Sequence, residues 1–241
     1  MNESVSFDRM ADKYDETRGG LVRGNNFATA ISPHLPPGSS ILEIGVGTGA
    51  IALPLVERGH TVTGVDISPA MLAHAHGRLG ARIAVADAMR LPVRAESVDA
   101  VLAVWVMHLV ADRSTVLAEC RRILRPGGRL VVVQAAAKEE PNDVADILQA
   151  LHGTRGRPAD LPGGIGMTPV HESYADFFEF EETPNQTKAI IEARTWSCLW
   201  DVSDDDWNTS VQPAVDQLAA LPGPDRLRHR TQSHPLLVFE Q

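Results

Sequence analysis

Short apolar runs alternate with amphipathic stretches along residues 39–134. This alternation is typical of strands and helices that follow one another in a parallel sheet with right-handed crossovers. Five of the runs are apolar at nearly every position, as strands covered on both faces require. The pattern therefore predicts buried strands at residues 40–45, 61–66, 82–86, 98–105 and 129–134.

Apolar residues recur at helical spacing between these strands. They predict helices at residues 50–57, 69–78 and 112–124. Ser68 precedes Pro69, which is the usual arrangement of an N-cap followed by a proline in the first turn. The run Pro126-Gly127-Gly128 is expected to end the third helix.

The segments on either side of this core carry weaker signals. Residues 7–32 are predicted to be a helical leader, which prolines and a glycine at 33–38 separate from the first strand. After residue 138, a predicted helix at 142–151 is followed by the Gly- and Pro-rich stretch 153–166, a candidate mobile lid. The later predictions are a strand at 177–182, helices at 187–193 and 204–221, and a last strand at 235–240.

Together these elements predict an α/β fold, with a doubly wound, mostly parallel seven-stranded sheet, an N-terminal helical leader and a C-terminal helical cap. The length of 241 residues suits a single domain, because one core stops growing near about 250–300 residues. We divide the expected domain, residues 1–241, into a leader at 1–37, a core at 38–137, and a lid or cap with the last strands at 138–241.

The composition is that of an ordinary globular chain, with 44% hydrophobic and 22% charged residues. The longest apolar run, residues 100–109, contains His108 and is much shorter than the ~20 residues that cross a bilayer. Residues 1–10 carry Glu3, Asp8 and Arg9 and do not resemble a secretory signal. We expect no membrane association and, by default, a cytoplasmic location.

Charge and metal-ligand spacing exclude two further classes of partner. A formal net charge of −9 disfavours nucleic acid, because it repels the phosphate backbone. Cys120 and Cys198 lack metal-ligand spacing and fit ordinary reduced thiols. The pair His171-Glu172 lacks the second histidine of a zinc motif, so no metal site is expected. The oligomeric state is not indicated.

Candidate chemistry begins where the first strand ends. The run Glu43-Ile44-Gly45-Val46-Gly47-Thr48-Gly49 places three glycines between a strand and a helix, which lets a ligand approach backbone N–H groups closely. Asp66 ends the second strand, 21 residues after Gly45 (66 − 45 = 21), where a carboxylate can accept both hydroxyl hydrogens of a ribose. The two features indicate a nucleoside-bearing cofactor.

The glycines alone leave two cofactors open, because Gly45, Gly47 and Ala50 also satisfy the dinucleotide pattern G-x-G-x-x-G/A. Glu43 is a poor neighbour for a pyrophosphate and suits a sulfonium or ammonium group. Neither tyrosine is followed by a lysine four positions later, so the Tyr-x-x-x-Lys arrangement of common dehydrogenases is missing. These residues favour a sulfonium cofactor over a nicotinamide.

The segment 42–49 resembles the first motif of the class I S-adenosylmethionine-dependent methyltransferases, specifically the small-molecule branch known as methyltransferase type 11-like. The later motifs follow in the correct order and spacing. They match residues 62–72, 86–92, 98–108 and 121–128, and residues 7–15 resemble the leader of such enzymes. The resemblance covers residues 38–135 and becomes weak beyond Lys138, in the part expected to select the substrate.

The resemblance implies a Rossmann-like fold with S-adenosyl-L-methionine as cofactor, and it implies roles for residues at the ends of the first three strands. Gly45, Gly47 and Gly49 would meet the methionine part, Asp66 the ribose, Ile67 the adenine face, and Asp87 with Ala88 the adenine edge. These positions lie at the carboxyl ends of parallel strands, where open α/β sheets bind ligands. A helix N-cap for Asp66 and a turn for Asp87 are the alternatives.

Five further residues are expected around the cofactor by resemblance. Glu43 would face its charged methionine portion or, alternatively, cap the glycine loop. Tyr14 would close over the cofactor and Arg18 would pair with its carboxylate, the alternatives being a packing aromatic and a solvated charge. Val104 and Trp105 end the fourth strand and would line the methyl-donor pocket, although Trp105 equally suits plain core.

His108 follows the fourth strand and is the candidate general base, because histidine titrates near neutral pH. A hydrogen-bonded packing residue is the alternative. The expected enzyme transfers a methyl group from S-adenosylmethionine to an O, N or C atom of a small-molecule acceptor by in-line displacement, giving S-adenosylhomocysteine. The alternative is a methyltransferase-fold enzyme that uses the cofactor for cyclisation, decarboxylation or hydroxylation, because a fold does not fix a function.

Overall fold

The computed structural model describes residues 3–134, 138–152, 166–200 and 202–241. Contacts between residues group the chain into two compact units, which we describe separately. The larger unit contains residues 2–135, 159–176 and 234–241, and the smaller contains residues 136–158 and 177–233. The candidate lid at 153–166 lies outside the described residues, except for Gly166.

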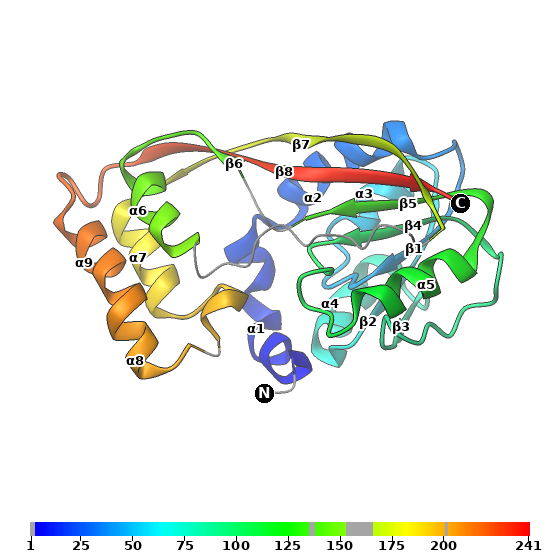
Figure 1. Cartoon of the computed structure of the whole chain (residues 1–241), viewed down its shortest axis with the longest axis horizontal. Helices are drawn as coiled ribbons and strands as arrows, with labels where there is room; N and C mark the ends of the chain where they lie inside the picture. The colour runs from blue at the N-terminus through cyan, green and yellow to red at the C-terminus, as the bar shows by residue number, and fades with distance from the viewer. Residues whose placement is uncertain (1–2, 135–137, 153–165, 201) are drawn as a thin grey trace. The chain divides into compact units, whose positions relative to one another are not determined.

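A twisted parallel sheet forms the centre of the larger unit (Figure 1). Its parallel strands are β1 (Ser40–Ile44), β2 (Thr61–Asp66), β3 (Ile83–Val85), β4 (Val98–Val104) and β5 (Leu124–Val133). They are ordered β3-β2-β1-β4-β5, and β8 (Arg228–Glu240) then pairs antiparallel to β5. Because β1 and β4 are neighbours, the chain reverses its winding between them, and the predicted doubly wound sheet is confirmed.

Alternate residues of the strands enter two separate cores, as a sheet covered on both faces requires. Leu102 and Val131 belong to the core on the side of helices α2, α3 and α4. Val101 and Val132 belong to the core on the side of α5. The helices are α2 (Gly20–Ile31), α3 (Ala52–Glu57), α4 (Pro69–Leu79) and α5 (Arg113–Ile123). All four strand residues are fully buried.

The predicted helical leader consists of two helices rather than one. Helix α1 (Glu3–Arg18) ends where Gly19 and Gly20 adopt φ angles of 79° and 45°, and α2 begins at Gly20. These left-handed angles are strained for residues with a side chain, so the two glycines permit the change of direction. A short 3-10 turn, Ser32–His34, follows α2.

Helix α5 ends within one residue of its predicted end. Its cap is Asp112, whose Oδ1 accepts the N–H of Ser114 at 2.9 Å. The helix stops at Ile123, and Pro126-Gly127-Gly128 lie within β5. Because Pro126 has no N–H, it could not donate a helical hydrogen bond to the carbonyl of Arg122. The carbonyls of Arg122 and Ile123 accept the N–H groups of Glu96 and Ser97 instead, at 3.0 and 2.8 Å.

The smaller unit has its own apolar core. Its helices are α6 (Asp143–His152), α7 (Pro184–Glu192), α8 (Asp204–Asp206) and α9 (Gln212–Ala220), with a 3-10 turn at Ser197–Leu199. The core includes Val144, Leu148, Ile191 and Leu218. The helix predicted at 204–221 is interrupted by a π-helical segment, Trp207–Val211. Pro213 follows this segment and has no N–H for a regular helical hydrogen bond.

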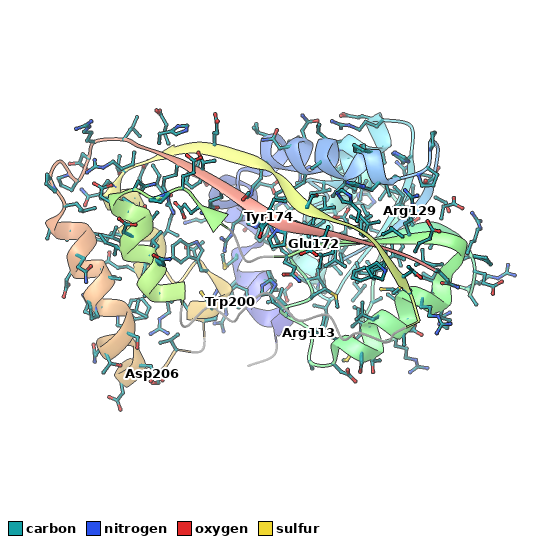
Figure 2. All side chains as sticks on the ribbon, turned by 45° about the horizontal axis from the view of Figure 1, so that its top comes forward. Arg113, Arg129, Glu172, Tyr174, Trp200 and Asp206 are labelled. Atoms are coloured by element: carbon teal, nitrogen blue, oxygen red, sulfur yellow. The ribbon has the colours of Figure 1, made fainter. Side chains whose placement is uncertain are left out.

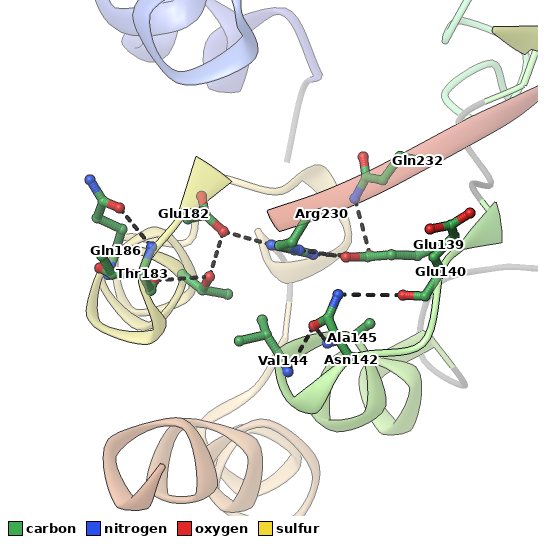
Figure 3. Close-up of polar contacts among 11 residues, drawn as sticks. Glu139, Glu140, Asn142, Val144, Ala145, Glu182, Thr183, Gln186, Arg230 and Gln232 are labelled. Carbon is green, nitrogen blue, oxygen red and sulfur yellow. Dashed lines mark hydrogen bonds and ion pairs between the residues drawn. The ribbon is translucent and has the colours of Figure 1, made fainter. Parts of the chain in front are cut away.

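A buried ionic network holds three strands of the smaller unit together (Figure 3). The side chain of Arg230 is 2% exposed; it pairs with Glu139 of β6 (Lys138–Glu139) and with Glu182 at 2.6 Å. Glu182 also accepts from the hydroxyl of Thr187 on α7, and Glu139 accepts from Gln232 at 3.2 Å. Since both carboxylates have several donors, their burial is compensated.

Two strands account for the difference between the expected and observed sheets. Strand β7 (Thr168–Glu182) is much longer than the predicted strand at 177–182, and it pairs with β8 outside the main strand order. With β6, the described chain has eight strands instead of the expected seven. Among the helices that the structure describes, none combines the length and the apolar character needed to cross a bilayer.

Candidate functional site

A hollow in the larger unit lies at the carboxyl end of β1 and β4, where the winding of the sheet reverses. Seven of the residues predicted for the cofactor line it: Tyr14, Arg18, Glu43, Gly45, Gly47, Val104 and Trp105. The rest of the lining comes mainly from α2 and the glycine loop: Asp15, Gly20, Arg23, Gly24, Phe27, Val46, Thr48, Ala50 and Ile51.

The glycine loop is shaped by its glycines and by the residues behind them. Gly45, Gly47 and Gly49 all have positive φ angles, of 66°, 55° and 77°. A Cβ atom on Gly45 would lie 2.1 Å from Cγ2 of Val106, whereas one on Gly47 would meet nothing within 4 Å. Gly45 is therefore required by packing, and Gly47 by its backbone conformation together with the open space in front of it.

Asp66 holds the glycine loop in place from the end of β2. Its Oδ2 accepts the N–H of Gly47 at 2.8 Å, and its Oδ1 accepts the N–H of Ser68 at 2.9 Å. Burial raises the pKa of Asp66, although these backbone hydrogen bonds counteract the rise. The cap of α4 is Ser68, whose hydroxyl accepts the N–H of Met71 at 3.1 Å, so Asp66 is not the N-cap.

Glu43 is a carboxyl group buried at the bottom of the hollow. It lies in β1, opposite Gly64 of β2 and Leu102 of β4, and is 2% exposed. Among the described residues, its Oε2 atom has no hydrogen-bond partner. Burial, and then the nearby charge of Asp66, raise the pKa of Glu43 to about 8. A buried acceptor of this kind is costly unless a ligand supplies a donor.

The leader is attached to the glycine loop by Asp15, a residue that no sequence motif selected as a site residue. The carboxylate of Asp15 accepts the hydroxyl of Thr48 at 2.6 Å and pairs with Arg78 of α4 at 2.5 Å. Arg78 also donates to the carbonyl of Thr48 at 2.8 Å. Asp15 ends the leader segment 7–15 that resembles those of similar enzymes, so its position next to Tyr14 was the available signal.

Tyr14 and Arg18 lie on α1, one turn apart, and both line the hollow. Burial raises the pKa of Tyr14, against the opposing charges of Arg18 and Arg23, so the phenol stays protonated at neutral pH. Arg23, on α2, was not predicted and no sequence motif singles it out. Burial, and then the charge of Arg18, lower the pKa of Arg23 to about 9, which leaves the guanidinium charged at neutral pH.

The residues predicted for the adenine lie outside the hollow's lining. Ile67 is 44% exposed, so its apolar side chain is accessible, as its predicted contact with the adenine face would require. Asp87 is exposed, and its Oδ1 accepts the N–H of Met89 at 2.8 Å, which is the turn conformation that we considered as the alternative. Ala88 is half-buried and packs against the core on the α5 side.

His108 lies in the loop after β4, is exposed, and does not line the hollow. Desolvation by the surrounding protein, and then the charges of Arg113 and Arg18, lower its pKa below the ordinary value of 6.5. The imidazole is therefore neutral at neutral pH and can accept a proton. Arg113, labelled on α5 in Figure 2, donates from Nε to the carbonyl of Met107 at 2.9 Å and so fixes the residue before His108.

These placements leave the proposed roles of individual residues as predictions. Gly49 shapes the loop from behind, since a Cβ there would lie 3.3 Å from Leu79. Within the described ranges, no three histidine, cysteine, aspartate or glutamate side chains gather in a way that could hold a metal ion.

The comparisons with known proteins agree with this picture. Residues 42–132 match the family described as methyltransferase domain. The chain is 36% identical over 132 residues to a demethylmenaquinone methyltransferase of Mycobacterium marinum. The matched region covers 53% of this chain and 57% of that protein. An enzyme of the same name from Tropheryma whipplei is 35% identical over 138 residues, covering 53% and 56%. The chain thus matches little more than half the length of these relatives.

Solved structures of similar fold cover nearly the whole chain. A candidate type II methyltransferase from Anaeromyxobacter dehalogenans has a TM-score of 0.62 at 22% identity, covering 89% of this chain and 94% of its own. The [4+2]-cyclase SpnF has a TM-score of 0.52 at 17% identity, covering 90% and 81%. At such identities the likeness shows the fold alone, and the fold accommodates more than one chemistry.

Proposed function

We propose that this chain, whose residues 42–132 match a methyltransferase domain, binds S-adenosyl-L-methionine and transfers its methyl group to a small-molecule acceptor. The observation that carries the proposal is Glu43, which lines a hollow beside a glycine loop and whose buried Oε2 has no hydrogen-bond partner among the described residues. A cofactor that carries an ammonium group would supply that donor.

The residues around the hollow fit the cofactor in two further ways. The carboxylate of Asp66 accepts backbone N–H groups, among them those of Gly47 and Ser68, and its two oxygens together offer about four lone-pair sites, which leaves room for a ribose hydroxyl. Exposed Ile67 follows Asp66 directly and offers an apolar face to a purine. When bound, the cofactor supplies an activated methyl group on a sulfonium. The protein's own tasks are then to align the acceptor, exclude water and, for an oxygen nucleophile, accept a proton.

The acceptor is proposed to be a small molecule methylated at O, N or C, with His108 as the candidate base. The named relatives act on demethylmenaquinone, so quinol-type compounds are the first acceptors to screen. A methylated product has a mass one methyl group higher than its substrate. A cyclised, decarboxylated or hydroxylated product, which the alternative chemistry would give, does not show this gain.

Calorimetric titration with S-adenosylmethionine, S-adenosylhomocysteine and NADH tests the cofactor. We expect micromolar binding of the first two, at least tenfold weaker binding in Asp66→Asn, and further weakening in Asp66→Ala, which also loses the acceptor for Gly47 and Ser68. Asp12→Asn, whose carboxylate lies at the surface, is the matched control with unchanged affinity. Binding of NADH alone would overturn the proposal.

A further inference from the structure

Arg23 lies in a cage of three rings at the wall of the hollow. Its Cζ is 4.0 Å from the ring centroid of Trp105 and 5.8 Å from that of Phe27. Phe27 and Trp105 meet edge to face at 4.9 Å, and both contact the ring of His234, at 5.6 and 5.1 Å. Stacking on an indole face favours a cation and fixes the plane of the guanidinium.

His234 determines the orientation of Arg23. The imidazole is 3% exposed, and its Nδ1 lies 3.2 Å from the carbonyl oxygen of Gln134, which can only accept. Nδ1 therefore carries the proton, and Nε2 accepts from Nη2 of Arg23 at 3.1 Å. Gln134, directly after β5, and His234, within β8, therefore hold a charged donor group at the hollow.

Trp105 adds a second donor in the same wall. Its Nε1 atom is buried and, within the part of the chain that the structure describes, has no acceptor. The residue also has a φ angle of 55°, which costs a residue with a side chain about 1–2 kcal/mol. Buried N–H groups almost always have partners, so an orphan donor in a binding hollow indicates a ligand that supplies an acceptor.

The strand order places Asp66 and Glu43 on one side of the hollow and the ring cluster around Arg23 on the other. Asp66 ends β2 and Glu43 lies in β1, on one side of the point where the winding reverses. Trp105 follows β4, and His234 contacts the end of β5, on the other side. Asp66 and Glu43 therefore lie on one side of the junction of β1 and β4, and Trp105 and His234 on the other.

Resting on the proposed function, we infer that Arg23 and the indole N–H of Trp105 form a subsite for an oxygen anion of the methyl acceptor, either a carboxylate or an acidic aromatic hydroxyl. Two donors, one of them charged, suit such an oxygen. The rings of Phe27 and Trp105 suit a flat molecule that carries it. His234 acts as a positioning residue, because it touches the guanidinium and not the ligand.

Competition between anionic and neutral probes tests this subsite. Benzoate and salicylate are titrated by ligand-observed NMR against protein saturated with S-adenosylhomocysteine, each beside its neutral amide. The wild type is expected to bind each acid at least tenfold more tightly than its amide. Arg23→Met should abolish this preference, Arg23→Lys should retain part of it, and Trp105→Phe should reduce it. Arg9→Met, at an exposed position of α1, is the matched control that retains it.

Binding of S-adenosylhomocysteine to each variant separates this subsite from the cofactor site. It should change less than threefold in Arg23→Met, with the melting temperature of Arg23→Lys reporting on the fold. A tenfold loss of S-adenosylhomocysteine affinity in Arg23→Met would assign Arg23 to the cofactor's own carboxylate and overturn the inference. Equal binding of acid and amide to the wild type, binding of neither, or a preference that persists in Arg23→Met would overturn it as well. A wild type that does not bind S-adenosylhomocysteine at all would instead contradict the proposed function.

Discussion

Glu43 combines two properties that normally exclude each other, since it is an acid buried in a core and has an oxygen without a donor among the described residues. Its folded-state pKa of about 8 lies above the ordinary value of 4.5, so the folded protein binds one more proton than the unfolded chain between these pH values. The free energy of unfolding therefore falls as the pH rises through this window. The ligand-free protein retains the acid at a cost in stability.

Glu43→Gln removes that cost, because an amide stays neutral at every pH. We expect the variant to gain stability relative to the wild type as the pH rises from about 5 to 9, and to bind S-adenosylmethionine at least tenfold more weakly. Urea unfolding at several pH values measures the first effect and calorimetry the second. Glu57→Gln, at an exposed position at the end of α3, should follow the wild-type profile. Parallel profiles for Glu43→Gln and wild type would contradict the buried-acid account.

Before the reaction, the imidazole of His108 is predicted to be neutral throughout the physiological pH range. If it is the base, His108→Ala lowers turnover by about 100-fold at unchanged cofactor affinity. Because its pKa is lowered, the rate should lose this histidine's contribution at a pH below the ordinary value of 6.5. Steady-state rates measured against pH decide this, with exposed His76→Ala as the control. Full activity of His108→Ala would remove it from the mechanism.

Individual residues were predictable where a motif or the strand periodicity singled them out. Glu43 and Gly45 stand in a glycine-rich run between a strand and a helix, which is typical of a ligand-binding loop, and the structure places both at the hollow. Arg23 was not predictable, because its partners Trp105 and His234 are far away in sequence and come together only through the sheet. A lone arginine in a helix carries no sign of what it will stack on.

At the scale of elements, the leader and the glycine loop behave as one structure. Asp15 joins α1 to Thr48 and Arg78. In the ion pair, the side chain of Asp15 is 30% exposed and that of Arg78 is 21% exposed. Hydrogen bonds to charged groups of this kind are each worth about 1.5–3 kcal/mol. The position of Tyr14, the neighbour of Asp15, therefore depends on this attachment.

Asp15→Asn is expected to weaken the binding of S-adenosylhomocysteine by about tenfold or more, because the leader would hold the loop less firmly. Calorimetry measures the affinity, and the rate of proteolysis within α1 reports the loosening of the helix. Asp12→Asn is a matched control on the same helix, since its carboxylate is 96% exposed and its pair with His74 contributes little. Unchanged affinity and proteolysis in Asp15→Asn would show that the leader is held by packing alone.

The elements of the parallel core were predictable to within a few residues, because buried strands and caps leave strong local signals. Strand β2 occurs at the predicted residues, and α4 begins after its predicted cap. The main exception has a non-local cause. Strand β7 is longer than its apolar run because it pairs with β8. Periodicity in one segment does not report such partners.

At the scale of the whole molecule, the chain forms two compact units with separate cores. Strands β7 and β8 each have residues in both units. The sequence predicted a single domain with a cap from residue 138, and the smaller unit begins at residue 136. The smaller unit depends on a charged network around Arg230 in addition to its apolar core. Its stability can therefore be perturbed through residues that belong to it alone.

Arg230→Met tests whether the smaller unit can be weakened without affecting the proposed cofactor site. Removing the arginine leaves Glu139 and Glu182, 6% and 15% exposed, without their cation, which typically costs about 3–5 kcal/mol. Three of the four tryptophans lie in this unit, so in a Trp105→Phe background their fluorescence reports its unfolding. We expect a lower urea midpoint but less than a threefold change in S-adenosylhomocysteine affinity. Lys188→Met breaks only a surface ion pair and should shift neither. A loss of S-adenosylhomocysteine affinity greater than threefold in Arg230→Met would mean that the proposed cofactor site requires the smaller unit.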